Sequence, residues 1–108
     1  MDPRDEPVDH AVLHLLQPGE HVEFALESFG AELRLTDGRL LVNYADDVRL
    51  AIPYERLRRV EFDLEAGRPS TMVVVPHHPA DEPQVLSVAR DQLHVAAEVL
   101  AYIGKRLP

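Results

Sequence analysis

The stretch AELRLTDGRLLVNY, residues 31–44, decides the fold that the sequence predicts. Apolar and polar side chains alternate before Asp37-Gly38, and a second strand-like segment follows it. Alternation with a period of two is typical of a half-buried strand. Asp-Gly between two such segments is typical of a hairpin closed by a type I′ turn, because that turn needs positive φ at both central residues. We therefore expect strands at residues 31–36 and 39–44.

Similar segments occur on both sides of this hairpin. Val60, Phe62 and Leu64 alternate with charged residues and are expected to share the face that points to the core. The segment Met72-Val73-Val74-Val75 is apolar on both faces, as in a central strand. Further strands are expected at residues 21–27, 48–52 (ended by Pro53), 59–65, 72–75 and 84–90.

The period changes to 3.6 after the last strand, which predicts a C-terminal helix with Asp91 as its N-cap. The stripe expected to face the core consists of Leu93, Ala96, Ala97, Leu100 and Ile103. About seven short strands with short connections are expected to close into a barrel or to form two packed sheets. Three further apolar residues widen the helix stripe beyond what one end of a barrel covers. They are the candidate surface for a partner or a second copy: Val95, Val99 and Tyr102.

A short helix is also expected near the N-terminus, with Asp9 as its cap and Pro18-Gly19 as its stop. Its apolar residues are Val12, Leu13, Leu15 and Leu16. This helix is the alternative to a partner, since its apolar side chains could pack on the terminal helix. Residues 1–8 are expected to be a flexible tail, and residues 9–108 a single domain.

The composition limits the functional classes. The chain has 108 residues, 45% of them hydrophobic, which suits one core. Lys and Arg number 11 against 19 Asp and Glu, a formal net charge of −8. This balance argues against nucleic acid and anionic lipid head groups as partners, because both attract basic surfaces. With no Cys, no signal peptide and no transmembrane segment in the sequence, we expect a soluble cytoplasmic protein.

Four stretches carry a resemblance to a known family: LLQPGEHVEF, LRLTDGRLLV, IPYERLRRVEF and DQLHVAAEVLAYIGKRL. They resemble bacterial pleckstrin-homology-like (PH-like) and GRAM-like domains over roughly residues 15–107. The resemblance implies a mostly β fold with a C-terminal α-helix: a seven-stranded antiparallel barrel of two packed sheets, capped by that helix. It also implies an interaction surface for proteins, lipids or copies of itself, with no common enzymatic activity. We expect no cofactor.

The first hairpin departs from one branch of that family. Phosphoinositide-binding members carry several Lys and Arg there, whereas this chain has Glu27, Glu32 and only Arg34. We therefore expect no phosphoinositide binding. The expected function is a non-enzymatic interaction module that binds a protein partner or self-associates. The alternatives are a small-molecule or lipid-binding barrel and a His-based metal-binding protein.

Two pairs of His are the candidates for that metal site. His10 and His14 lie four apart and would share one face of a helix, while His77 and His78 are adjacent in a proline-rich loop. Each pair supplies only two ligands. An exposed helix face would equally explain the first pair, and a solvated loop would equally explain the second. No metal is therefore expected.

Arg56, Arg58, Arg59 and Arg68 form the basic concentration of the sequence, a candidate patch for an anion or an acidic peptide. Glu55, Glu61, Asp63 and Glu65 are interleaved with them, and local ion pairing is the alternative. For catalysis, the sequence has no Gly-rich phosphate loop and no nucleophile elbow. We therefore expect no enzymatic activity.

Overall fold

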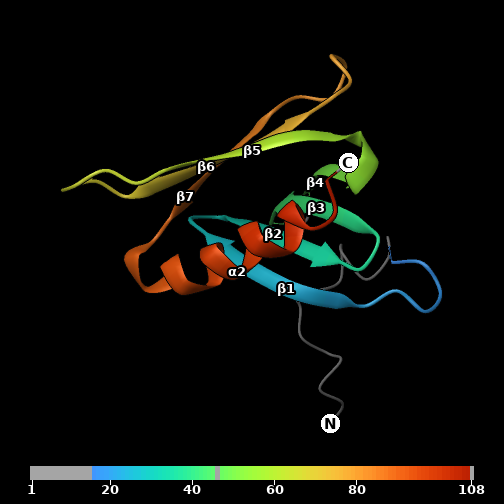
Figure 1. Ribbon diagram of the computed structural model, residues 1–108, viewed down its shortest axis with the longest axis horizontal. Helices are drawn as coiled ribbons and strands as arrows, with labels where there is room; N and C mark the ends of the chain where they lie inside the picture. The colour runs from blue at the N-terminus through green and yellow to red at the C-terminus, as the bar shows by residue number, and fades with distance from the viewer. Residues whose placement is uncertain (1–15, 46, 108) are drawn as a thin grey trace, which may run out of the picture.

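The computed structural model describes residues 16–45 and 47–107, and within these ranges it contains two antiparallel sheets and a C-terminal helix (Figure 1). The first sheet has the order β1-β2-β3-β4: β1 Val22–Ser28, β2 Ala31–Thr36, β3 Arg39–Tyr44 and β4 Asp47–Pro53. A 3₁₀ turn, η3 (Tyr54–Arg56), leads to the second sheet, β5-β6-β7: β5 Leu57–Asp63, β6 Ser70–Pro76 and β7 Gln84–Val88. The chain ends in η4 (Arg90–Gln92) and helix α2 (Leu93–Gly104).

The expected closed barrel is wrong. Ladder pairing runs from β1 to β4 and from β5 to β7, and no ladder joins the two sheets among the described residues. The chain leaves the first sheet at Pro53 and turns through η3, so β5 starts a second sheet. A side chain bridges the sheets instead: the Tyr44 hydroxyl donates a 3.1 Å hydrogen bond to the Val85 carbonyl on β7.

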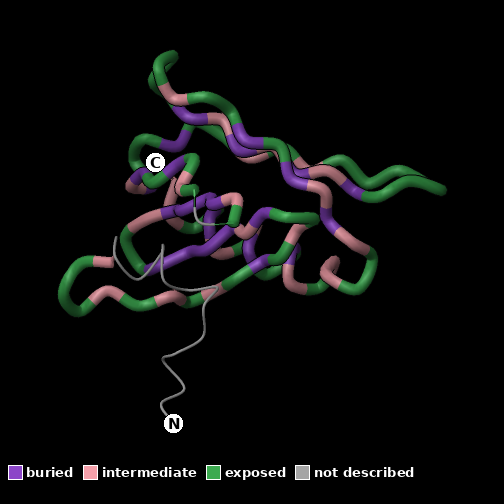
Figure 2. Tube along the Cα trace, turned by 180° about the vertical axis from the view of Figure 1, so that it is seen from behind, coloured by how far each residue is buried: buried purple, intermediate pink, exposed green. Residues whose placement is uncertain are grey.

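The core lies between the two sheets and α2. Alternate residues of β2 and β3 enter it, among them Leu33, Leu35 and Leu40, which are fully buried. Strand β6 is the central strand of its sheet, as expected, and contributes Met72 and Val74. Figure 2 shows buried stretches in the middle of the sheets and exposed hairpin tips. From α2 the buried residues are Ala96, Val99 and Ile103.

The hairpin at residues 31–44 is confirmed, but the expected type I′ turn is wrong. Neither Asp37 nor Gly38 has a positive φ. The Thr36 side chain closes the turn: its hydroxyl accepts hydrogen bonds from the backbone N–H groups of Gly38 (3.2 Å) and Arg39 (2.9 Å). A side chain that hydrogen-bonds to its own turn removes the need for left-handed backbone.

Three element ends also differ from expectation. Strand β5 ends at Asp63, so Leu64 lies beyond the strand and its side chain is exposed. Strand β7 ends at Val88 rather than at Arg90. Asp91 is not the N-cap, because it lies within η4, and α2 begins after Gln92 without a side-chain cap. The 3₁₀ turn η4 occupies the residues between β7 and α2, where the alternation typical of a strand changes to the period of a helix.

A polar and aromatic cluster ties the segment before β1 to the β2–β3 turn and to the end of α2. Glu20 pairs with Arg39 and accepts a hydrogen bond from the Thr36 hydroxyl. The Tyr54 hydroxyl donates a 2.6 Å hydrogen bond to the Thr36 carbonyl. Tyr102 of α2 contacts the Tyr54 ring edge-to-face, with centroids 6.3 Å apart. These hydrogen bonds and ring contacts therefore hold together the end of the fold that contains the β2–β3 turn and the last turns of α2.

The expected N-terminal helix and the tail at residues 1–8 lie outside the described residues. Among the described residues, no helix is long and apolar enough to cross a membrane.

Candidate interaction groove

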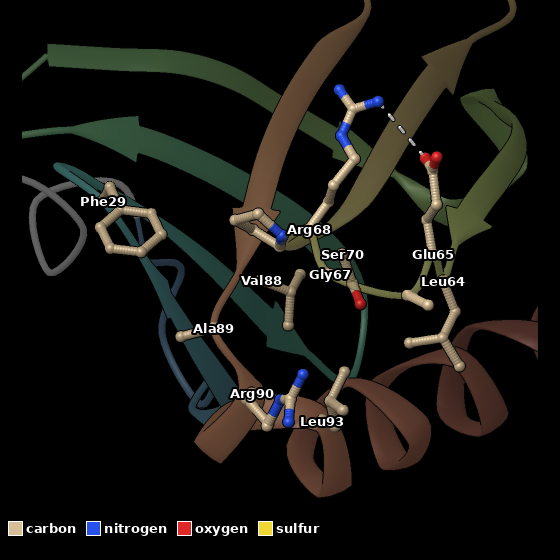
Figure 3. A pocket seen from close by; sticks show the side chains of 12 residues that line it. Phe29, Leu64, Glu65, Gly67, Arg68, Ser70, Val88, Ala89, Arg90 and Leu93 are labelled. Carbon is tan, nitrogen blue, oxygen red and sulfur yellow. Dashed lines mark ion pairs between the residues drawn. The ribbon is translucent and has the colours of Figure 1, made fainter.

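An open groove of about 900 Å³ lies at the other end of α2 from the aromatic cluster. Three elements enclose it: the β1–β2 turn, the tip of the β5–β6 hairpin and the start of α2 (Figure 3). The β5–β6 hairpin projects beyond the body of the molecule, so its tip forms one wall of the groove (Figure 1). The lining residues are Phe29, Leu64–Ser70, Val88–Arg90 and Leu93.

Two exposed apolar side chains line this groove. Phe29 is 72% exposed and Leu64 is 69% exposed, and they stand on opposite sides of the groove in Figure 3. Phe29 occupies the β1–β2 turn, where Gly30 takes a positive φ of 78° and the chain reverses before the ring can join a strand face. Leu64 follows the last residue of β5. Large exposed apolar side chains that face one cavity are typical of a binding surface.

The floor of the groove is part of the folded core. Ser70 and Val88 are cross-strand partners at the end of the β6–β7 ladder, and both are buried. Leu93, at the start of α2, packs against the core cluster. Backbone pairing and core packing therefore hold the floor, while the two walls at Phe29 and Leu64 are exposed turns.

The charge at the groove differs from that of the whole chain. Arg68 and Arg90 are exposed and line the groove, and the acid among its lining residues is Glu65. Arg68 Nη1 lies 3.6 Å from Glu65 Oε2, but both side chains are more than half exposed, so solvent weakens this ion pair. The groove thus presents two guanidinium groups within a chain whose net charge is −8.

Phe29 also borders a smaller hollow of about 230 Å³. Glu27 and Asp91 line this hollow, together with Ala89. Phe29 therefore lines both a groove with two Arg and a hollow with two acids.

The surface predicted on the terminal helix is largely part of the core. Val99 is fully buried, while Val95 and Tyr102 are partly buried against the core cluster. Tyr102 packs edge-to-face on Phe24, with centroids 5.1 Å apart, and Arg106 covers its ring at 3.4 Å from the centroid. Ala97, expected to face the core, is exposed. The helix is rotated from the expected orientation, so its widened stripe meets β1 and the aromatic cluster.

The four Arg of the predicted basic patch do not form one cluster. Arg56 is the last residue of η3 and Arg58 lies in β5, both near the Leu57–Pro76 pair, whereas Arg68 lies beyond the Asp63–Thr71 pair at the opposite end of the strand. Arg59 forms an ion pair with Glu61 on the same strand. A strand rises about 3.3 Å per residue, so the length of β5 separates the two groups. Of the four, only Arg68 lines the groove.

The His candidates divide between described and undescribed residues. His10 and His14 lie outside the described residues. His77 and His78 are exposed in the β6–β7 loop, and His78 Nδ1 accepts a hydrogen bond from the Ala80 N–H at 3.0 Å. Within residues 16–45 and 47–107, no group of three or more His, Asp or Glu is placed to hold a metal ion.

Sequence reasoning did not identify Phe29 or Leu64. Phe29 precedes Gly30 in a predicted turn, and a large apolar side chain in a turn is the signal that would have found it. Leu64 continues the alternation of Val60 and Phe62, so its pattern is that of a core residue. Its exposure depends on where the strand ends, which alternation does not determine.

Comparison with known proteins supports the fold. No family model matches the chain, and no curated protein matches it. A crystal structure of a pleckstrin homology domain from Shewanella amazonensis SB2B is similar, with a TM-score of 0.60 and 15% sequence identity. The similarity covers 88% of this chain and 84% of that one.

The chain therefore has a PH-like fold: seven strands in two antiparallel sheets with a C-terminal helix. The groove at Phe29 and Leu64 is the place on the described surface where two exposed apolar side chains face one cavity.

Proposed function

We propose that this protein is a non-enzymatic interaction module that holds a segment of a protein partner in the groove between Phe29 and Leu64. The exposure of both side chains toward one cavity is the observation that carries the proposal. Each would gain about 1.5 to 3 kcal/mol if a partner covered it completely. Such anchors dominate the energy of interfaces when they lie at the centre of a contact.

The charge of the groove favours a particular chemistry of the partner. Arg68 and Arg90 would face the segment, and Arg recognises carboxylates through its planar guanidinium. The proposed ligand is therefore a peptide segment with large apolar side chains and neighbouring Asp or Glu. This chemistry is consistent with the PH-like fold and does not require phosphoinositide binding.

A phage-displayed peptide library tests this proposal. The full chain is used for selection, and enriched peptides are measured against Phe29→Asp and Leu64→Asp by fluorescence anisotropy. We expect enriched peptides to contain apolar and acidic residues and to lose at least tenfold in affinity, about 1.4 kcal/mol, for each variant.

Val85→Asp is the matched control, because Val85 is 57% exposed but does not line the groove. This variant should bind the selected peptides like the wild type. Peptides that bind all three variants equally would refute the groove as the site, and so would a library without any enriched peptide. Sedimentation equilibrium of the wild type tests self-association: a dimer that Phe29→Asp dissociates would make a second copy the occupant.

A further inference from the structure

Strand β5 forms an open edge of the second sheet. It pairs with β6 on one side, and on its other side no strand pairs with it among the described residues. The β5–β6 hairpin runs along the upper side of the molecule in Figure 1. An unpaired edge presents backbone N–H and C=O groups that can pair with a strand of another chain.

The core-facing side chains of β5 are less well covered than those of the neighbouring strand. Val60 and Phe62 are only partly buried, although both pack against the core cluster. Their cross-strand partners on β6, Val74 and Met72, are 0% exposed. Burial therefore falls toward the free edge of β5, where a further strand would lie. Covering the apolar area of Val60 and Phe62 would favour such an addition.

The other three edge strands have more cover than β5. On β4, the core-facing Leu50 and Ile52 are 5% and 3% exposed. Helix α2 packs against β1. On β7, the Val85 carbonyl accepts the hydrogen bond from the Tyr44 hydroxyl of the first sheet. We therefore take β5 as the edge that is available for pairing.

The outer face of β5 carries opposite charges at alternate positions. Arg59 and Glu61 form an ion pair, and their side chains are 50% and 53% exposed. In an antiparallel two-fold pairing centred on Val60, Arg59 of each copy would lie opposite Glu61 of the other. Opposite charges across neighbouring strands are favourable. A pairing centred on Glu61 would place two Glu opposite each other, which is unfavourable.

We propose that a second copy of this chain pairs edge to edge with β5, across a two-fold axis at Val60. The result is one continuous antiparallel sheet with three strands from each copy. The two Val60 side chains would be neighbours on the core-facing side and would cover each other. On the outer side, the Arg59–Glu61 pairs of the two copies would form a cluster of four alternating charges.

The contact is short, so the dimer is weak. The register of β5 shifts between Leu57 and Arg59, and an irregular strand end does not continue a ladder. Pairing is therefore centred on residues 59–61. A contact of this length is smaller than a standard interface, and we expect a dissociation constant of about 0.1 mM. Salt at about 0.15 M screens the repulsion between two acidic chains.

Isotope-filtered NMR of the full chain tests this contact. Protein labelled with ¹³C is mixed with unlabelled protein at about 1 mM, well above the expected dissociation constant. We expect intermolecular NOEs between the Val60 methyl groups of the two copies, and none at Leu50 on the β4 edge. A protein that is monomeric at this concentration, or intermolecular NOEs at Leu50 instead of Val60, would overturn the proposal.

A charge exchange tests the register. Arg59→Glu places two Glu opposite each other at both ends of the pairing, and we expect the dissociation constant from sedimentation equilibrium to rise at least tenfold. The double variant Arg59→Glu/Glu61→Arg restores opposite charges and should bring the constant back to within about threefold of the wild type. A double variant as weak as Arg59→Glu would overturn the proposal. Unchanged amide shifts in β2 and α2 show that each variant is folded.

Two further variants are matched controls. Arg49→Glu changes the same charge in a pair of the same spacing, Arg49–Asp47 on β4, and should leave the dissociation constant unchanged. Phe29→Asp should also leave it unchanged, because Phe29 lies in the β1–β2 turn. Dissociation of the dimer by Phe29→Asp but not by Arg59→Glu would overturn the β5 contact and would place the second copy in the groove.

Discussion

Glu20 and Arg39 form a two-point ion pair, with Nη2–Oε1 and Nε–Oε2 distances of 2.7 and 3.1 Å. The side chain of Glu20 is only 7% exposed and that of Arg39 17%. The Thr36 hydroxyl adds a 2.6 Å hydrogen bond to Glu20 Oε2. The pair therefore joins the segment before β1 to the β2–β3 turn, at the end of the fold that holds the polar and aromatic cluster.

The stability of the protein should fall at acid pH because of this pair. The Arg39 hydrogen bonds, with help from Thr36 and the Gln17 N–H, lower the pKa of Glu20 from 4.5 to about 2 despite its burial. The folded state favours the ionised carboxylate, so its contribution is complete above about pH 4.5 and is lost as the pH falls toward 2. We expect a loss of about 2 to 3 kcal/mol over this interval, measured by urea unfolding.

Glu20→Gln should remove this contribution at neutral pH. The substitution keeps the shape of the side chain but leaves Arg39 facing a neutral amide, so we expect a loss of about 2 kcal/mol in the free energy of unfolding. Its stability should also depend less on pH between 4.5 and 2 than that of the wild type. Glu55→Gln, at an exposed position, is the control. Equal stability of the two variants would contradict the role of the pair.

Tyr54→Phe should destabilise the fold more than Tyr102→Phe. The Tyr54 hydroxyl donates to the Thr36 carbonyl at 2.6 Å in a buried place, whereas the Tyr102 hydroxyl approaches the same carbonyl at 3.5 Å. Burial also raises the pKa of Tyr54, so its hydroxyl stays protonated and keeps donating in alkaline solution. We expect losses of about 1.5 kcal/mol for Tyr54→Phe and about 0.5 kcal/mol for Tyr102→Phe in urea unfolding.

Arg106→Ala should loosen the end of α2. The guanidinium lies 3.4 Å from the centroid of the Tyr102 ring and donates a 3.2 Å hydrogen bond to the Tyr102 carbonyl. We expect a loss of about 1 kcal/mol and faster hydrogen exchange in the last turn of the helix. Lys105→Ala removes the same charge from the exposed neighbouring position and should change stability by less than about 0.5 kcal/mol. Similar losses in both variants would point to charge alone.

Val99→Ala should behave as a core substitution. Val99 is fully buried, so truncation removes two methyl groups from the core and leaves a cavity. We expect a loss of about 2 kcal/mol in the free energy of unfolding. Val85→Ala, at a position that is 57% exposed, should cost less than about 0.5 kcal/mol. A Val99→Ala variant with wild-type stability and altered self-association would instead indicate that Val99 belongs to an interaction surface.

Local patterns were sufficient to predict the strands and the terminal helix. Alternation around Asp37-Gly38 marked the β2–β3 hairpin, and the doubly apolar run at Met72–Val75 marked the central strand of the second sheet. These features are local because strand and helix periods repeat within a few residues. The turn conformation was harder to predict, since the Thr36 hydroxyl satisfies the backbone there and no positive φ is needed.

The local periods of strands and helices did not predict the candidate groove. Leu64 has the spacing of a core residue, and its exposure follows from the end of β5 at Asp63. Arg56 and Arg68 are close in sequence, but the length of a strand separates them.

The sequence by itself determined the element order, the mostly β class and the acidic charge, because each depends on residue type and local period. Only the tertiary structure decided that the two sheets stay open, that Val99 enters the core and that Phe29 and Leu64 face one groove. Those outcomes depend on how the second sheet and α2 pack on the first. Packing is a property of surfaces that meet across long separations in the chain, and periodicity within one segment does not specify it.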